Sequence, residues 1–318
     1  MSNLVRIWYV APQRLCNFDC PYCVSTGDWA KDSRVDWQVR QDQDNFERTV
    51  RWIGTRPFPV GVRLGTLGEP FTSRGFLSQL AWLTTQCNVR FVEVVTNGSL
   101  LKSRLPKLAE TADLTRLSLW ITHHHSQIPV GRLIDNAVAA QEDFGCFVVI
   151  NGLLFADTVD RVAELRAAAA AARLRFNVDL GYEPDAQVGT YSTAAQVVPF
   201  SHRSDWWEQA MRLGADRELL AANLVGLDAA QGRPCAAGHD SLFIGIDGEV
   251  YPCSRYYELG QNRLGNVLDS DFELRLRPER WAACKAACGC SNKEDFLNLD
   301  IVDRDRRAQV PSLGWLGT

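Results

Sequence analysis

The sequence LVRIWYV (residues 4–10), followed closely by CNFDCPYC (residues 16–23), decides the fold. The first stretch is an apolar run with the length of a buried strand. The second places Cys16, Cys20 and Cys23 on a short loop after that strand. Three thiolates on one loop can bind three irons of a [4Fe–4S] cluster and leave the fourth iron open to another ligand. The alternative is a zinc loop, which needs a fourth cysteine or histidine nearby, and the sequence places none there.

Further apolar runs follow, separated by segments with helical spacing. The runs cover residues 60–64, 90–96, 116–122, 147–155 and 176–180, and the helical segments include 44–53, 76–84 and 159–173. Strands that alternate with helices predict a parallel sheet, whereas a half-exposed antiparallel sheet fits helix-length connections poorly. The strands also alternate polar with apolar residues, which predicts a lumen lined by Arg63, Glu93, Ser118, Trp120, Asn151, Asn177 and Asp179. Since a packed (β/α)8 barrel is filled with branched aliphatic side chains, we expect an α/β fold with a partial (β/α)6 TIM-like barrel that holds a ligand.

The composition is that of an ordinary globular protein. The 318 residues carry a formal charge of −4, which gives no basic surface for nucleic acid. No apolar run approaches the ~20 residues that span a bilayer, and the first residues show no signal-peptide pattern. We therefore expect a cytoplasmic protein that binds neither nucleic acid nor membrane. Because cytoplasmic thiols stay reduced, the ten cysteines indicate metal binding, apart from Cys87 and Cys146, which we interpret as core packing.

The C-terminal part has its own cysteine group. Periodicity is lost over residues 182–203, which predicts a barrel with its linker (1–203) and a C-terminal module (204–318) that contains a β-hairpin and a helix. The hairpin is indicated by Asp247-Gly248 between two alternating stretches. The module holds Cys235, Cys253, Cys284, Cys288 and Cys290. Residues four apart share a helix face and residues two apart share a face of an extended chain, so the last three can converge. A structural zinc ribbon is the alternative.

The cysteine loop resembles that of the radical S-adenosylmethionine (SAM) superfamily, and the resemblance covers most of the chain. The aromatic residue before the last cysteine, Tyr22, is usual in that superfamily. The resemblance implies that Cys16, Cys20 and Cys23 hold a [4Fe–4S] cluster whose open iron chelates SAM. It also implies that an external one-electron reductant, of the flavodoxin or ferredoxin type, drives cleavage of SAM to a 5′-deoxyadenosyl radical that abstracts hydrogen from substrate.

Further superfamily motifs occur where predicted strands end. The sequence TLGEP (residues 66–70) resembles the Gly-Gly-Glu-Pro motif that contacts the methionyl amine, with Leu67 in place of the first glycine. The resemblance also assigns ribose binding to a polar residue on the fourth strand. The cofactor-binding residues that it implies are Tyr22, Gly68, Glu69, Pro70, Asn97, Ser118 and Asn151. His123, His124 and His125 follow the fourth strand, and we interpret them as a solvated loop. The alternative is that one of them contacts the substrate or acts as a base.

The C-terminal cysteines resemble a twitch domain, a shortened SPASM domain that holds an auxiliary [4Fe–4S] cluster. Five thiols compete for at most four irons, so at least one can be spare. One partition uses Cys235 and Cys253 with two of the last three cysteines. The other uses Cys235, Cys284, Cys288 and Cys290 and leaves Cys253 as a thiol that can return a hydrogen atom to a substrate radical. The sequence leaves both partitions open.

The size of the chain and its single auxiliary module resemble enzymes that epimerise or dehydrogenate carbinol carbons in aminoglycoside and aminocyclitol pathways. The resemblance implies a small polar substrate, and Asp179 and Glu183, near predicted strand ends, are carboxylates that suit an amine on it. The spare thiol favours epimerisation, with Cys253 as the catalytic hydrogen donor. Dehydrogenation to a ketone is the first alternative, and radical modification of a peptide is a further one.

Overall fold

A computed structural model describes residues 4–20, 23, 40–155, 157–180, 204–286, 290 and 292–300. Tyr22, Glu183 and Cys288 lie outside these described residues, as does the predicted linker 182–203. The roles expected for those three residues therefore stay predictions.

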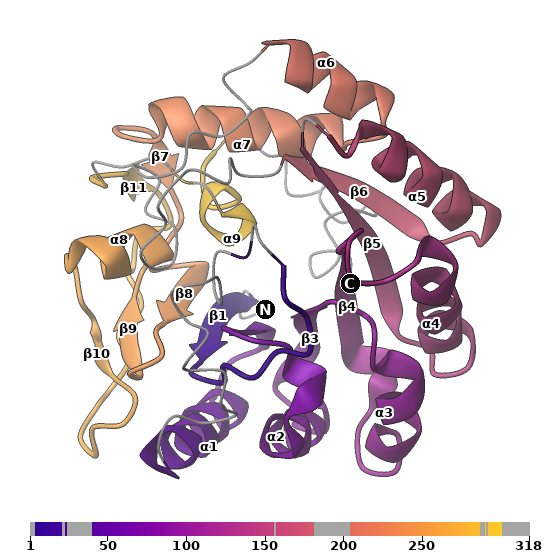
Figure 1. Cartoon of the computed structure of the whole chain (residues 1–318). Coiled ribbons are helices and arrows are strands. Elements are labelled where there is room, and N and C mark those ends of the chain that lie inside the picture. The colour runs from indigo at the N-terminus through magenta and orange to yellow at the C-terminus, as the bar shows by residue number, and fades with distance from the viewer. Residues whose placement is uncertain are drawn as a thin grey trace.

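Six parallel strands form the centre of the fold, each next to its neighbour in the sequence. They are β1 (Val5–Ala11), β2 (Val60–Thr66), β3 (Val89–Thr96), β4 (Leu117–His123), β5 (Phe147–Leu154) and β6 (Arg175–Leu180). Five helices cover the outer face of this curved sheet (Figure 1): α1 (Arg40–Gly54), α2 (Arg74–Thr84), α3 (Leu101–Leu108), α4 (Val130–Glu142) and α5 (Val159–Ala171). The short helices η2 (Pro70–Thr72) and η3 (Leu114–Arg116) precede α2 and β4. All six predicted strands and the partial (β/α)6 barrel are confirmed.

The two faces of the strands explain why the barrel forms from this sequence. On β2, Val62 and Leu64 are fully buried in the main core cluster, together with Leu80 and Leu83 of α2. Burial of each such side chain stabilises the fold by about 1.5–3 kcal/mol. Arg63, between the two β2 residues, points to the opposite face because side chains alternate along a strand. The outer face thus holds the apolar core, and the inner face is free to carry polar groups.

The C-terminal residues extend the same sheet and close its open side. They form α6 (Ser204–Arg212), α7 (Arg217–Ala229), β7 (Pro234–Cys235), β8 (Ser241–Ile244), β9 (Glu249–Tyr251), α8 (Ser254–Leu259), β10 (Gly265–Asn266), β11 (Ala282–Ala283) and α9 (Lys293–Phe296). The predicted hairpin is β8–β9, and Gly248 in its turn has a φ of +79°, which a residue with a side chain rarely adopts. Strand β8 pairs in parallel with β1, so the sheet runs β10-β9-β8-β1-β2-β3-β4-β5-β6. A domain boundary near residue 203 stays a prediction.

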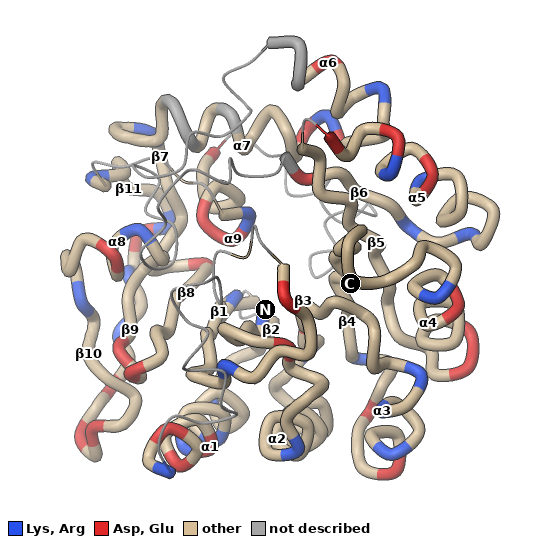
Figure 2. Tube along the Cα trace, in the orientation of Figure 1, with Lys and Arg blue, Asp and Glu red and all other residues tan. Residues whose placement is uncertain are grey.

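The short helix α9 lies on the inner side of the sheet, between β1 and α7 (Figure 1). Figure 2 shows charged positions mostly on the outer helices, and again on α9 in the interior. Within the described ranges, no helix is both long and apolar enough to cross a membrane. The fold therefore brings a charged segment from the end of the described chain into the centre of the barrel.

Candidate active site

The backbone of the TLGEP loop holds the segment that leads into the cysteine loop. The N–H groups of Leu67 and Gly68 both donate to the carbonyl of Gln13 at 3.0 Å, and the N–H of Glu69 donates to the carbonyl of Leu15 at 2.8 Å. A Cβ atom on Gly68 would lie 2.3 Å from the Leu15 carbonyl oxygen. Only glycine permits this close approach. Gly68 thus sets the position of Leu15, which directly precedes Cys16.

Glu69 joins the TLGEP loop to the end of β3. Its carboxylate accepts hydrogen bonds from the Thr96 hydroxyl at 2.7 Å, from the Asn97 N–H at 2.8 Å and from the Phe71 N–H at 3.1 Å. The side chain is buried, and burial raises the pKa of Glu69 to about 7 although these three donors lower it. The three hydrogen bonds of this buried carboxylate hold the loop after β2 against the end of β3.

The cysteine loop is also held by the loops after β3 and β4. The Asn97 amide donates to Asn17 Oδ1 at 3.0 Å, and the Asn17 amide donates to Ser99 Oγ at 2.9 Å. The Gln127 amide donates to the Asp19 carbonyl at 2.9 Å and accepts from the Asp19 N–H at 3.2 Å. These contacts fix the loop over the carboxyl ends of the central strands, where barrel enzymes place their chemistry.

A cavity of about 410 Å³ lies beneath this loop. Its wall near the loop is formed by Cys16, Cys20, Cys23, Phe18, residues 66–69, Thr96, Asn97, Thr122 and His124. Its other walls come from the strands, from α7 and from α9. The cavity therefore joins the cysteine loop to the predicted polar lumen.

The three thiols suit an iron–sulfur cluster better than a single ion. Among the described residues, no three His, Cys, Asp or Glu side chains gather closely enough to hold one metal ion. A cubane cluster does not need such a group, because each thiolate binds a different iron. Cys16, Cys20 and Cys23 all line one cavity, and the loop that carries them is held from two sides. The donor set fits a [4Fe–4S] cluster, which Cys16, Cys20 and Cys23 would hold at the wall of that cavity.

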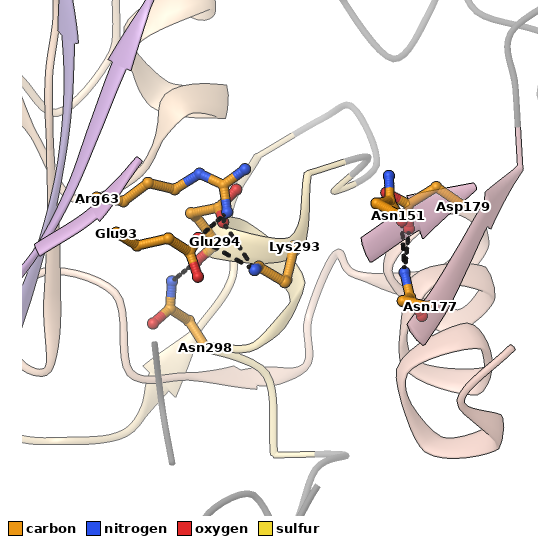
Figure 3. A network of polar contacts seen from close by, with 8 residues as sticks. All are labelled: Arg63, Glu93, Asn151, Asn177, Asp179, Lys293, Glu294 and Asn298. Carbon is orange, nitrogen blue, oxygen red and sulfur yellow. Dashed lines mark hydrogen bonds and ion pairs between the residues drawn. The ribbon is translucent and has the colours of Figure 1, made fainter. Parts of the chain in front are cut away.

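Three charged side chains at the inner end of the cavity, Arg63, Lys293 and Glu294, form one bonded group with the fully buried Glu93 behind them (Figure 3). Arg63 forms ion pairs with Glu93 and Glu294, and Lys293 Nζ lies 3.2 Å from Glu93 Oε1. Lys293 Nζ also lies 3.8 Å from the centre of the Trp120 ring. Burial lowers the pKa of Lys293, and the Glu93 carboxylate raises it. Two cations and two anions make this group neutral as a whole.

Asp179 belongs to a separate polar group on the other side (Figure 3). The Asn151 amide donates to its Oδ2 at 2.8 Å, and the Asn177 amide donates to its Oδ1 at 2.9 Å. Within the described part of the chain, no Lys, Arg or His side chain forms an ion pair with Asp179. Burial raises the pKa of Asp179, while the nearby charge of Lys293 and the two amides lower it. Asp179 is thus a carboxylate of the cavity wall that has no counter-ion among the described residues, as are Glu69 and Asp216 nearer the cysteine loop and α7.

The described C-terminal cysteines form a second group. Cys253, Cys284 and Cys290 are buried, and Cys235 is half-buried. Burial raises the pKa of Cys235 to about 12, and the charge of Cys284 raises it further. Burial also raises the pKa values of Cys253 and Cys290. The charge of Cys235 contributes to the rise in both. Cys253 and Cys284 belong to one buried cluster, Cys235 packs against it, and Cys235 also packs against the cluster that contains Cys290. An auxiliary iron–sulfur cluster at these residues stays a prediction.

Cys253 lies outside the lining of the large cavity. It borders a smaller hollow with Glu294 and Asp295 of α9. Asp295 accepts hydrogen bonds from the N–H of Ser254 at 3.1 Å and from its hydroxyl at 2.5 Å. One face of α9 therefore holds the residue after Cys253, and its other residues line the cavity. This helix separates Cys253 from the cavity.

The remaining residues predicted to bind the cofactor or to line the lumen differ in where they lie. Pro70 is buried at the start of η2, and Asn151 is buried in the Asp179 group. Ser118 is buried at the level of Glu93, outside the cavity lining, so its ribose-binding role stays a prediction. Of the seven residues predicted for the polar lumen, Arg63, Trp120, Asn177 and Asp179 line the cavity. Glu93, Ser118 and Asn151 are buried outside its lining.

Two expectations were wrong. Cys87 is exposed and not part of the core, because it lies in the turn between α2 and β3, whereas Cys146 is buried as expected. The interpretation of the three histidines as a solvated loop is wrong for His123, whereas His124 is half-buried at the cavity wall, where the alternative of a histidine near the substrate would place it. His123 is buried and its Nε2 lies 3.0 Å from the Ile128 carbonyl oxygen. His124 lines the cavity, and burial lowers its pKa to about 4.

Sequence reasoning missed the contribution of α9. Lys293, Glu294 and Phe296 line the cavity although they follow the last cysteine of the C-terminal group. Only their position shortly after Cys290 could have drawn attention to them, and that signal does not predict an inward path.

Comparisons with known proteins identify structures that share the fold of this chain. No family model matches this chain, and no curated protein matches it. SuiB from Streptococcus suis has a TM-score of 0.53 at 12% identity, over 88% of this chain and 67% of that chain. SuiB bound to S-adenosylmethionine also gives 0.53, at 13% identity over 88% and 67%. BtrN in complex with AdoMet and 2-DOIA gives 0.43, at 15% identity over 84% and 80%, and supports no further inference. The chain therefore has the fold that its resemblance to the radical SAM superfamily led us to expect.

Proposed function

We propose that this protein is a radical SAM enzyme that abstracts a carbinol hydrogen from a small, polar, amine-bearing substrate. One observation carries the proposal: three thiols and the half-buried carboxylate of Asp179, which has no counter-ion among the described residues, line the same cavity. A cluster held by Cys16, Cys20 and Cys23 would supply SAM cleavage and a 5′-deoxyadenosyl radical. SuiB, which has the same fold, binds S-adenosylmethionine.

The substrate class follows from the charges at the inner end of the cavity. The group of Arg63, Glu93, Lys293 and Glu294 is neutral as a whole, and Asp179 adds one negative charge. A buried carboxylate is costly unless a cation pairs with it. An amine on the substrate would provide that cation, and hydroxyl groups would suit the surrounding amides and charges. Peptide modification lacks a comparable supporting feature in the described residues, although SuiB has been solved with its precursor peptide SuiA.

The position of Cys253 favours oxidation of the carbinol to a ketone. After loss of the carbinol hydrogen atom, the substrate radical becomes a ketone when its hydroxyl group loses a proton and the radical loses one electron. The buried cysteines near Cys253 suit an auxiliary cluster that would accept that electron. The helix between Cys253 and the cavity makes direct return of hydrogen by this thiol less favourable.

Epimerisation by thiol hydrogen return is the second candidate. Five C-terminal cysteines exceed the four corners of one cluster, so one thiol remains for other chemistry. Turnover in deuterated water separates the two outcomes, because a thiol exchanges its hydrogen with solvent. An epimer with one deuterium at the inverted carbon supports this candidate, and a ketone supports oxidation.

The direct test is 5′-deoxyadenosine formation by anaerobically reconstituted protein with SAM and a flavodoxin- or ferredoxin-type reductant. We expect the wild-type protein to release 5′-deoxyadenosine and Cys16→Ala/Cys20→Ala/Cys23→Ala to release none. Replacing the exposed Cys87 with Ala is the matched control and should change nothing. Equal 5′-deoxyadenosine formation by the triple variant would disprove the proposal.

A further inference from the structure

Lys293 is the one ammonium group among the residues that line the cavity in the described part of the chain. It begins α9, and two contacts fix its Nζ atom: Glu93 Oε1 at 3.2 Å and the Trp120 ring at 3.8 Å. The side chain is only 9% exposed. A long, flexible lysine is thus held in one place at the wall of a cavity, which costs conformational entropy that a solvent-exposed lysine does not lose.

The hydrogen-bonding capacity of Lys293 exceeds what the described residues use. An ammonium group has three N–H donors. One faces Glu93, another can face the Trp120 ring, and Glu294 lies farther away at 3.9 Å. Glu93 also has a second cation, since it forms an ion pair with Arg63. Lys293 is therefore not the only group that neutralises Glu93, and it has a donor left for a molecule in the cavity.

Asp179 supplies the complementary chemistry in the same cavity. Its carboxylate is an acceptor held by two neutral amides, and the charge of Lys293 is close enough to lower its pKa. No ion pair joins the two side chains, and Figure 3 shows them in separate clusters. A donor and an acceptor that do not bond to each other can each bond to a different group of one ligand.

We propose that Lys293 donates a hydrogen bond to a hydroxyl oxygen of the substrate while Asp179 binds its amine, so that the cavity selects amino alcohols. This inference rests on the proposed function and extends it in two ways: Lys293 contacts the substrate, and the substrates that the cavity selects are amino alcohols. It assigns α9 a part in substrate recognition. Lys293 is then a specificity residue, beyond its structural role in the charged group.

The test uses three six-membered-ring probes on the reconstituted holoenzyme with SAM: glucosamine, glucose and cyclohexylamine. Their affinities can be measured by ligand-observed NMR. We expect Lys293→Met to weaken binding of glucosamine and glucose about tenfold or more, because it removes a hydrogen bond from a charged donor, and to leave cyclohexylamine unchanged. Asp179→Asn should weaken glucosamine and cyclohexylamine and leave glucose unchanged. Lys293→Arg should retain most of the glucose affinity.

The double variant Lys293→Met/Glu93→Gln separates recognition from structure. It removes one cation and one anion together, so the charged group stays neutral. If Lys293 contacts the ligand, the double variant keeps the loss of glucose affinity. If Lys293 only neutralises Glu93, the double variant regains wild-type affinity, and our inference is overturned. An equal loss for all three probes in Lys293→Met would overturn it as well.

The wild-type protein distinguishes a failure of this inference from a failure of the proposed substrate class. If neither glucosamine nor cyclohexylamine binds, the amine-bearing substrate is wrong, whereas a loss of glucose binding in Lys293→Met would still support the role of Lys293. If no probe binds the wild-type protein, both the substrate class and the role of Lys293 are refuted.

Discussion

The two cysteine groups differ in what surrounds their sulfur atoms. Cys16, Cys20 and Cys23 lie on a loop at the carboxyl ends of the strands and line a cavity of about 410 Å³. Cys253 and Cys290, in contrast, are more than nine-tenths buried and lie outside the lining of that cavity. A site that must bind a second ligand needs an open side, whereas a site that only stores or passes electrons does not. This difference supports our proposal that the first group holds a cluster that binds SAM and that the second holds an auxiliary cluster.

Helix α9 is the link between the two groups. It starts shortly after Cys290, its Asp295 holds the residue that follows Cys253, and its Lys293 and Glu294 join the charged group inside the barrel. A change at the buried cysteines can therefore reach the cavity through a single short element.

The largest expected effect is on SAM cleavage. Replacing Cys16, Cys20 and Cys23 with Ala should abolish 5′-deoxyadenosine formation, because no other described cysteines line the cavity. Replacing Cys253 with Ala should leave this reaction in place, since that residue lies outside the cavity. If the two variants lose 5′-deoxyadenosine formation to the same degree, the two cysteine groups do not have separate roles.

The next largest effect is expected on the iron content and substrate oxidation of Cys253→Ala. If it is a ligand of the auxiliary site, Cys253→Ala should lose about four irons per chain and stop substrate oxidation. The iron and acid-labile sulfide contents measure this loss. A variant that keeps all its iron, cleaves SAM and makes no epimer would instead identify Cys253 as a hydrogen donor and favour epimerisation.

A smaller effect is expected from the contact that positions the cysteine loop. In Gly68→Ala the new Cβ would lie 2.3 Å from the Leu15 carbonyl oxygen, so the loop must shift. A displacement of about 1 Å at a reacting centre lowers the rate by about a hundredfold. Gly131→Ala is the matched control, because a Cβ there meets nothing within 4 Å. Equal rates of SAM cleavage in the two variants would show that Gly68 does not position the loop.

The smallest effect is expected at Asp179, and it depends on pH. Only the ionised carboxylate pairs with an amine, and burial raises the pKa of Asp179. Affinity for an amine-bearing ligand should therefore fall as the pH falls through this raised pKa. Asp179→Asn should bind about tenfold more weakly and lose that pH dependence. Asp143→Asn, at an exposed position after α4, should retain the affinity and the pH dependence of the wild-type protein.

The sequence predicted the barrel well because each strand carries a strong local signal. Alternation around Arg63 and Asp179 indicated polar side chains inside the sheet, and Asp247-Gly248 indicated the hairpin. The position of the cysteine loop also followed from the strand before it. These features depend on residues close together in the sequence, so they can be predicted from the sequence alone.

Contacts between distant segments could not be predicted in this way. The bond of Lys293 to Glu93 joins residues 200 positions apart, and nothing near Lys293 in the sequence indicates it. The burial of His123 depends on how the loop after β4 folds back, which brings the Ile128 carbonyl oxygen to 3.0 Å from His123 Nε2 as a hydrogen-bond acceptor. The same holds for the separation of Cys253 from the cavity, which depends on the path of α9.

The central claim is that the two cysteine groups hold separate iron–sulfur clusters. The most direct measurement is the iron and sulfide content, with the visible absorption spectrum, of anaerobically purified Cys16→Ala/Cys20→Ala/Cys23→Ala. We expect this variant to retain about four irons per chain, half of the wild-type content, together with broad visible absorption. A variant that contains no iron, or zinc in its place, would contradict the claim.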